Sequence, residues 1–289
     1  MLEKVHQAGR QAALAAGALM RINYRQPQRV TLKGTIDPVT ETDLQAQEII
    51  IALIRNNFPD HVFLAEEVAG GLDQSGGRVG EGPRSRGADV SGPGVPSGEF
   101  GSSPPPPCRW IIDPLDGTVN FAHGYPAFCV SIAFEAEARL EYGVIYDPLR
   151  DELFEGRRGG GAFLNGRLIR VSRTDRLDRA LLATGFPYDI RERLPETLAR
   201  LGRLLGVAQG VRRAGSAALD MCYVACGRFD GFWEENLKPW DTAAGLLIIE
   251  EAGGKITTFS GGGYDIYSPN ILVSNGILHE RLIQHIKST

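Results

Sequence analysis

The chain has 289 residues, of which 43% are hydrophobic and 23% are charged, and its formal net charge is −4. These values are ordinary for a folded globular protein, and the length fits one large domain or two closely packed halves. The basic clusters are only pairs of arginines, so we expect neither nucleic-acid binding nor a polybasic membrane anchor. No apolar run approaches the roughly 18–20 residues that a membrane span needs.

The cysteine and histidine residues form no zinc-binding pattern, because the four cysteines include no Cys-x-x-Cys pair and the five histidines are scattered. Cys222 and Cys226 lie four residues apart in an apolar helical pattern, where buried free thiols are the simplest interpretation. Since disulfides are rare in reducing compartments, we expect free cysteines and a cytoplasmic protein.

The first part of the chain is expected to be mainly helical. Small and apolar residues recur on one helical face over residues 1–24, and Glu3 argues against a secretory signal peptide. Residues 33–43 read as a polar connector with few strand-forming residues. Thr40 and Asp43 at its end have the spacing of a helix-capping signal, which predicts a second helix from there.

Residues 70–108 differ from the rest of the chain because they contain 11 glycines and seven prolines. This content is typical of low-complexity segments that do not fold into a core. We expect a mobile insertion in a surface loop. It lies between Glu66 and Asp113, so two interpretations stay open: a passive insert and a lid over a site.

The remaining sequence mixes strand-like and helix-like segments. The expected strands are 62–64, 129–134, 140–146, 153–155, 162–164, 168–171, 181–184, 229–234 and 271–274. The expected helices are 191–205, 216–226, 241–252 and 277–286. This mixture predicts a layered α/β or α+β architecture.

A strand-like run that begins at Trp110 leads into a turn with two carboxylates, Asp113 and Asp116. Hard cations such as Mg²⁺ prefer oxygen ligands of this kind. Gly117 leaves room for a phosphate, and Thr118 adds a hydroxyl that can orient a water molecule. Asp-Pro-x-Asp-Gly is also an ordinary turn sequence, so the pentapeptide does not establish a site alone. An aspartyl-phosphate enzyme resembling the haloacid dehalogenase group would need Asp-x-Asp spacing, which is absent.

Two further acidic positions have simple structural explanations when taken alone. Glu66 and Glu67 follow a short strand and fit a solvated pair, and Asp241 fits the N-cap of its expected helix. Three acidic positions with neighbouring glycines or hydroxyls are harder to explain in this way. Together they predict metal-dependent hydrolysis of a phosphate ester.

These segments resemble the signatures of the inositol monophosphatase family, and the resemblance extends over the whole chain outside residues 70–108. The matching segments are 37–43, 66–67, 110–121, 215–218, 240–245 and 251–254. The resemblance implies the αβαβα layered fold of inositol monophosphatase and fructose-1,6-bisphosphatase. It also implies an N-terminal half over 1–185, a C-terminal half over 186–289, and a homodimer.

The resemblance further implies a role for individual residues around two or three Mg²⁺ ions. The metal ligands would be Glu66, Asp113, the Leu115 carbonyl, Asp116 and Asp241. The residues that help activate water would be Glu66 and Thr118, with Asp43 supporting Thr118. The substrate contacts would come from Asp116, Gly117, Thr118, Gly215, Ser216, Ala217, Glu234 and Asp241. Lys33 would belong to a mobile loop.

The implied activity is Mg²⁺-dependent, lithium-sensitive hydrolysis of inositol 1-phosphate by a metal-activated water, without a covalent intermediate. Glu234 lies seven residues before Asp241, at the position that contacts inositol in the family, and this favours an inositol phosphate. Fructose-1,6-bisphosphate, histidinol phosphate and 3′-phosphoadenosine 5′-phosphate stay open as substrates. A regulatory protein that keeps the fold and assists transcription is the alternative from another class.

Overall fold

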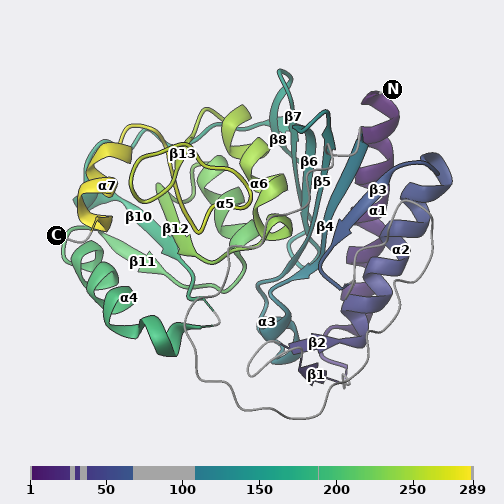
Figure 1. Ribbon diagram of the computed structural model, residues 1–289, viewed down its shortest axis with the longest axis horizontal. Helices are drawn as coiled ribbons and strands as arrows, with labels where there is room; N and C mark the ends of the chain where they lie inside the picture. The colour runs from purple at the N-terminus through teal and green to yellow at the C-terminus, as the bar shows by residue number, and fades with distance from the viewer. Residues whose placement is uncertain (1, 27–29, 33–37, 68–107, 188, 288–289) are drawn as a thin grey trace, which may run out of the picture.

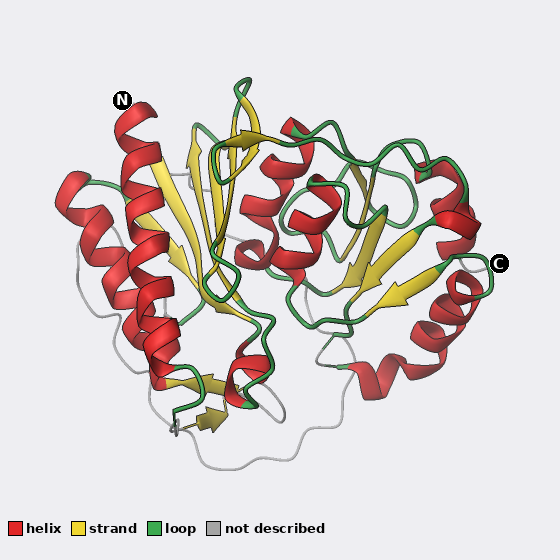
Figure 2. Cartoon of the chain, turned by 180° about the vertical axis from the view of Figure 1, so that it is seen from behind, coloured by secondary structure: helices red, strands yellow, loops and turns green. Residues whose placement is uncertain are grey.

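The computed structural model describes residues 2–26, 30–32, 38–67, 108–187 and 189–287. Within them, two large sheets alternate with helices (Figure 1). A pair of helices covers the outer face of each sheet, and a third pair lies between the sheets (Figure 2). The order of layers is therefore αβαβα, which confirms the predicted fold.

The first outer layer consists of α1 (Leu2–Asn23) and α2 (Glu41–Asn57). The capping signal predicted for α2 is present. The Thr40 hydroxyl accepts a hydrogen bond from the backbone of α2, and the Asp43 carboxylate accepts one from Thr40 N at 2.9 Å. This reciprocal pair satisfies backbone donors that the first turn of a helix leaves free.

The larger sheet has seven strands in the order β3-β4-β5-β6-β7-β8-β9. Its strands are β3 (Val62–Ala65), β4 (Cys108–Asp116), β5 (Cys129–Ala136), β6 (Arg139–Asp147), β7 (Glu152–Arg157), β8 (Gly161–Leu164) and β9 (Arg167–Leu168). β3 and β4 are parallel, and the other neighbours are antiparallel. Successive side chains of a strand face opposite sides. Trp110 accordingly packs in the core with α1 and α2, and Ile111 packs in the core with the central helices.

The second sheet has five strands in the order β11-β10-β12-β14-β13. Its strands are β10 (Leu181–Thr184), β11 (Gly210–Arg212), β12 (Gly231–Glu235), β13 (Lys255–Thr257) and β14 (Asn270–Ser274). Its outer face packs against α4 (Ile190–Leu205) and α7 (His279–Ile286), through Leu182 and Leu272 among others. The expected chain division at residue 185 remains a prediction.

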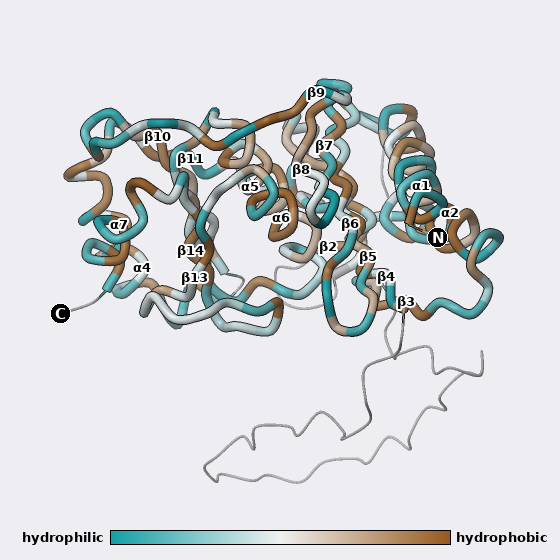
Figure 3. Tube along the Cα trace, turned by 90° about the horizontal axis from the view of Figure 1, so that it is seen from above, coloured by the Kyte–Doolittle hydropathy of each residue, from teal (hydrophilic) through white to brown (hydrophobic). Residues whose placement is uncertain are grey.

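The central helices are α5 (Ala217–Ala225) and α6 (Pro239–Glu251). Every α6 residue from 242 to 249 is buried, and the helix is largely apolar, whereas α1 and α2 alternate between polar and apolar residues (Figure 3). Gly143 and Gly156 allow α6 to approach the larger sheet, because a Cβ at either position would lie within 3 Å of the α6 backbone. α6 is thus held firmly between the two sheets.

The start of α6 differs from the prediction. The helix begins at Pro239 with Lys238 as N-cap, so Asp241 is the third helical residue and not the cap. The Asp241 carboxylate reaches back and accepts a hydrogen bond from Lys238 N at 2.6 Å. Proline is favoured at the first helical position, where its missing N–H costs nothing.

The predicted strand over 168–171 is wrong beyond Leu168, where β9 ends. From there the chain crosses towards the second sheet, and Val171 N donates to Ala252 O after α6. Two edge strands of three residues, β11 and β13, were not predicted. A small hairpin of β1 (Val30–Leu32) and β2 (Pro38–Thr40) also occupies part of the region expected to be a connector.

The predicted insertion lies outside the described residues, except for Cys108, which begins β4. All four cysteines are free, as predicted, although Cys226 is only partly buried. Among the helices of the described ranges, none is sufficiently long and apolar to span a bilayer. The short helices α3 (Thr118–Ala122) and η1 (Leu177–Arg179) complete the fold.

Candidate active site

A cavity of about 260 Å³ opens where the two sheets and the central helices meet. It lies at the end of β4 and the starts of α3, α5 and α6, with the ends of β10 and β12 on the opposite wall. Its lining includes Glu66, Asp113, Leu115, Asp116, Gly117, Thr118, Gly185, Phe186, Arg213, Gly215, Ser216, Ala217, Asp220, Glu234, Trp240 and Asp241. All site residues expected from the sequence are in this lining except Asp43 and Lys33.

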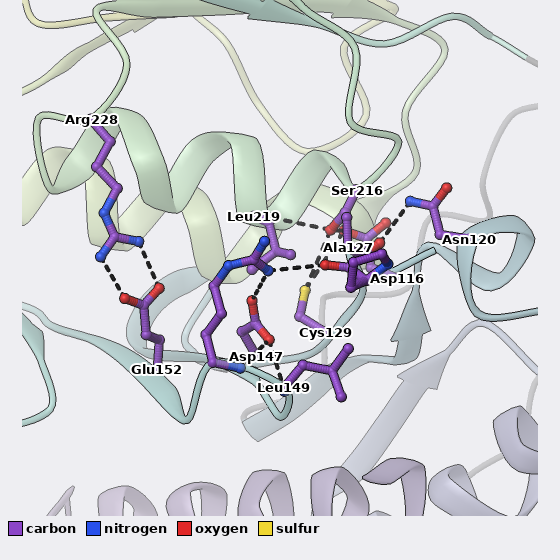
Figure 4. A network of polar contacts seen from close by, with 12 residues as sticks. Asp116, Asn120, Ala127, Cys129, Asp147, Leu149, Glu152, Ser216, Leu219 and Arg228 are labelled. Atoms are coloured by element: carbon purple, nitrogen blue, oxygen red, sulfur yellow. Dashed lines mark hydrogen bonds and ion pairs between the residues drawn. The ribbon is translucent and has the colours of Figure 1, made fainter. Parts of the chain in front are cut away.

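Three aspartates of the lining each accept hydrogen bonds from the protein through one carboxylate oxygen. Asp113 Oδ1 accepts from Leu115 N at 3.0 Å, and Asp241 Oδ2 accepts from Lys238 N. Asp116 Oδ2 accepts from Ser216 Oγ at 2.6 Å and from Ala218 N at 2.8 Å (Figure 4). These hydrogen bonds orient each carboxylate, and they involve only one of its two oxygens.

The carboxylates of the lining are buried and repel one another. Burial raises the pKa of Asp113 well above its ordinary range, and the nearby charges of Glu66, Asp116 and Asp241 raise it further. Burial and the Asp116 charge likewise raise the pKa of Asp241 well above its usual value. Such a group is costly to keep ionised without a cation.

The donor set fits a hard divalent cation, because it consists of carboxylate oxygens around an anionic point. In the described part of the chain, however, no three Asp, Glu, His or Cys side chains are already arranged as a finished metal site.

Thr118 connects the cavity to Asp43 beneath it. Thr118 Oγ1 donates to Asp43 Oδ1 at 2.9 Å and lies 3.0 Å from Leu115 O. Asp43 is fully buried, which raises its pKa, and its hydrogen bonds to Thr40 and Thr118 partly offset this effect. Because the Thr118 proton is directed at protein acceptors, its oxygen keeps lone pairs that can accept a hydrogen bond from water.

Asn120 joins the two halves of the cavity wall and was not singled out from the sequence. Its Nδ2 donates to Ala127 O at 2.7 Å and to Ala214 O at 2.8 Å. Ala214 immediately precedes Gly215, which has a φ of +88° that favours glycine. Asn120 thus fixes the loop that delivers Ser216, the N-cap of α5.

The far wall of the cavity contains Glu234, as expected, and three residues that sequence reasoning missed: Gly185, Arg213 and Asp220. Asp220 had a usable signal, because it is the one charged residue in α5, whose other residues are mostly apolar. Gly185 had none, since its importance depends on the neighbouring strand. Lys33 lies outside the described residues.

Comparison with known proteins points in the same direction. The model of the inositol monophosphatase family matches residues 1–289. A Synechocystis protein named inositol-1-monophosphatase is 41% identical over 280 residues, which cover 96% of this chain and 87% of that protein. The Nus factor SuhB of Escherichia coli K12 is 41% identical over 268 residues, covering 91% of this chain and 88% of its own.

A solved structure supports the fold. The crystal structure of the extragenic suppressor protein suhB from Bartonella henselae superimposes with a TM-score of 0.84 at 37% identity. The superposition covers 99% of this chain and 99% of that one.

Proposed function

Because the chain belongs to the inositol monophosphatase family and is a phosphoric monoester hydrolase of that family, we propose that its substrate is an inositol monophosphate. The observation that carries this proposal is that one cavity holds both Glu234 and an acidic cluster, which consists of Glu66, Asp113, Asp116 and Asp241. The cluster suits the phosphate end of the substrate. Glu234 suits its hydroxyl groups.

The carboxylates would hold two or three Mg²⁺ ions. The proposed ligands are Glu66, Asp113, the Leu115 carbonyl, Asp116 and Asp241. Bound Mg²⁺ supplies neutralisation of phosphate charge and a water of lowered pKa. The fit of the donor set and the mutual repulsion of its members support this assignment.

The protein groups around the cluster would orient water and phosphate. We propose that Thr118 Oγ1 accepts a proton from the attacking water while its own proton passes to Asp43 Oδ1, to which it donates a hydrogen bond. The first N–H groups of α3, beside Gly117, point out of the helix and would hold phosphate oxygens. Glu66 would assist the same water.

The substrate hydroxyls would meet the other wall of the cavity. We propose that Gly215, Ser216 and Ala217 contact the substrate near the phosphate, and that Glu234 contacts the ring. Rates measured with Mg²⁺ on inositol 1-phosphate, fructose-1,6-bisphosphate, histidinol phosphate and 3′-phosphoadenosine 5′-phosphate test this choice. A clear preference for any of the last three would overturn it. We also expect Li⁺ to inhibit.

A second candidate is a role in transcription, because relatives at 41% identity are named Nus factor SuhB. The relative named inositol-1-monophosphatase is equally similar. The two roles can be separated by a pull-down from cell extract with the wild-type protein and with Asp113→Asn. Recovery of transcription factors by both proteins would support the second role, and recovery by neither would count against it.

We further propose a cytoplasmic homodimer. The free cysteines fit a reducing compartment. The dimer is implied by the family resemblance alone, and sedimentation equilibrium tests it directly.

A further inference from the structure

Asp220 is a buried carboxylate at the cavity whose hydrogen-bonding capacity is not used by the protein. It lies on α5, is 1% exposed, and lines the cavity. Its Oδ1 is shut off from solvent and has no hydrogen-bond partner in the described part of the chain. Burying a carboxylate without a donor is much more costly than burying an apolar side chain, so a purely structural role explains this position poorly.

Glu234 lies in the same wall and has a similar environment. Burial raises its pKa well above the ordinary value, and Asp220 is the largest of the neighbouring charges that raise it further. Burial also raises the pKa of Asp220 well above its usual range, with Asp116 contributing next. No hydrogen bond among the described residues gives the Glu234 side chain a donor. Two neighbouring carboxylates of the cavity wall therefore carry oxygens that receive no hydrogen bond from the described residues.

Gly185 shows how closely Glu234 is fitted into this wall. Parallel pairing of β10 with β12 places Thr184 beside Trp233, so Gly185 follows next to Glu234. A Cβ at Gly185 would lie 2.0 Å from both carboxylate oxygens of Glu234. The absence of a side chain at Gly185 is thus what allows the Glu234 carboxylate to occupy its place.

Arg213 limits which ligands suit the two carboxylates. It lines the same cavity, lies over the Phe186 ring, and its positive charge lowers the pKa of both Asp220 and Glu234. No ion pair within 4 Å joins it to either carboxylate among the described residues. Because a cation is already present, a second cation on the ligand is not required. A second phosphate would meet two carboxylates, which disfavour it.

We propose that Asp220 and Glu234 together form a subsite for neighbouring hydroxyl groups of the substrate, with Asp220 as a specificity-determining acceptor. This inference rests on the proposed phosphatase function and extends it. The hydroxyls of a polyol donate to the unmatched carboxylate oxygens, and the same oxygens reject a second phosphate. Recognition of this kind discriminates strongly, because a substrate without the hydroxyls leaves buried acceptors unpaired.

The test compares two esters that differ in their hydroxyl groups. With Mg²⁺, kcat and KM are measured on inositol 1-phosphate and on 4-nitrophenyl phosphate for the wild type, Asp220→Asn and Asp220→Leu. For Asp220→Leu we expect kcat/KM on inositol 1-phosphate to fall on the order of 10-fold or more, mainly through KM, with a much smaller fall on the aryl ester. Asp220→Asn keeps one acceptor and should lie between. Fructose-1,6-bisphosphate should become a relatively better substrate of both variants.

The matched control is Asp147→Asn. Asp147 is also 1% exposed, but its carboxylate caps a turn through Leu149 N and Arg150 N, outside the cavity lining. This variant should lower the melting temperature without changing the ratio of the two substrates. If Asp220→Leu fails to fold, Asp220→Asn still gives the ratio.

The outcomes separate the two proposals. A wild type that hydrolyses neither ester overturns the proposed function and this inference with it. An active wild type whose folded Asp220 variants lose both activities equally, or lose neither, overturns this inference alone. A gain on histidinol phosphate as large as the gain on fructose-1,6-bisphosphate would also count against it, because histidinol phosphate has one phosphate and the loss of a group that rejects a second phosphate would not favour it.

Discussion

Ser216 Oγ donates a 2.6 Å hydrogen bond to Oδ2 of Asp116, and this bond joins the N-cap of α5 to the last residue of β4 (Figure 4). The same hydroxyl accepts from Leu219 N, so one side chain caps a helix and orients a carboxylate. The two walls of the cavity come from segments 100 residues apart in the sequence. Their spacing therefore depends on a few bonds of this kind.

Replacing Ser216 by alanine should weaken metal binding. The change removes one of the two hydrogen bonds to Asp116 Oδ2 and leaves the one from Ala218 N. Groups that orient metal ligands typically contribute 10- to 100-fold to metal affinity. We expect the Mg²⁺ concentration for half-maximal activity to rise about 10-fold, and stability to fall by about 1 kcal/mol through the lost cap. Ser172→Ala is the control, since Ser172 bonds to Asp230 away from the cavity. An unchanged Mg²⁺ requirement would contradict the anchoring role.

Thr118→Val should lower kcat with little effect on KM. Valine keeps the shape of threonine but lacks the hydroxyl that bridges the cavity to Asp43. Loss of a group that receives a proton from the nucleophile usually costs about 10²-fold or more. Thr118→Ser, which retains the hydroxyl, should recover most of the rate. Steady-state kinetics on inositol 1-phosphate check this, and an equally impaired serine variant would show that packing matters more than the hydroxyl.

Asp113→Asn should abolish nearly all activity while leaving the protein folded. The change removes the charge at the centre of the acidic cluster, and we expect kcat/KM to fall at least ~10³-fold. Without metal, the variant should be at least as stable as the wild type, because a buried repelling charge has gone. Thermal melts with and without Mg²⁺ measure this. Substantial Mg²⁺-dependent turnover in the variant would rule out the metal assignment.

The parts of the fold that sequence reasoning predicted are those with strong local signals. The strand that contains Trp110 combines a buried apolar run with two carboxylates at its end. The glycines after α6 end that helix as expected. Three-residue edge strands such as β11 and β13 carry too few residues for a pattern. Their pairing is decided by the neighbouring strands.

The site was predictable where its chemistry follows from residue type and spacing, and not where it depends on contacts across the fold. Gly185 is an ordinary glycine until β10 pairs with β12 and brings it against Glu234. Asn120 likewise acquires its role only when α3 meets the Gly215 loop. Asp241 was expected as a cap, but Pro239 extends α6 by two residues and turns its carboxylate back to Lys238.

The metal-free protein should lose stability as pH rises, more steeply than Asp113→Asn. The folded-state pKa of Asp113 is raised above its usual 3.8, so the folded protein binds more protons than the unfolded one between 3.8 and the raised value. Stability therefore falls as pH rises through that window. Burial lowers the pKa of His279 to about 4, which acts in the opposite direction, but both proteins share it.

The difference between the two melting temperatures reports Asp113 together with the carboxylates coupled to it, since the His279 contribution cancels. Measured with a chelator from about pH 5 to about pH 8, the advantage of Asp113→Asn over the wild type should grow with pH. Adding Mg²⁺ should remove it. Parallel curves for the two proteins would mean that Asp113 is not destabilised by its neighbours in the folded state.

Gly185→Ala should impair recognition of the substrate ring without touching the acidic cluster. A Cβ 2.0 Å from the Glu234 carboxylate oxygens forces that side chain to move. A displacement of about 1 Å can cost up to ~10²-fold in rate, so we expect a rise of about 10-fold or more in KM for inositol 1-phosphate. The requirement for Mg²⁺ should stay close to that of the wild type.

Gly202→Ala is the matched control, because no atom lies within 4 Å of a Cβ at that helical position. There, alanine should leave the kinetics unchanged and stabilise α4 by about 0.5–1 kcal/mol. If Gly185→Ala bound inositol 1-phosphate as tightly as the control does, the Glu234 carboxylate would not need its present position, and the hydroxyl subsite would have to be built differently.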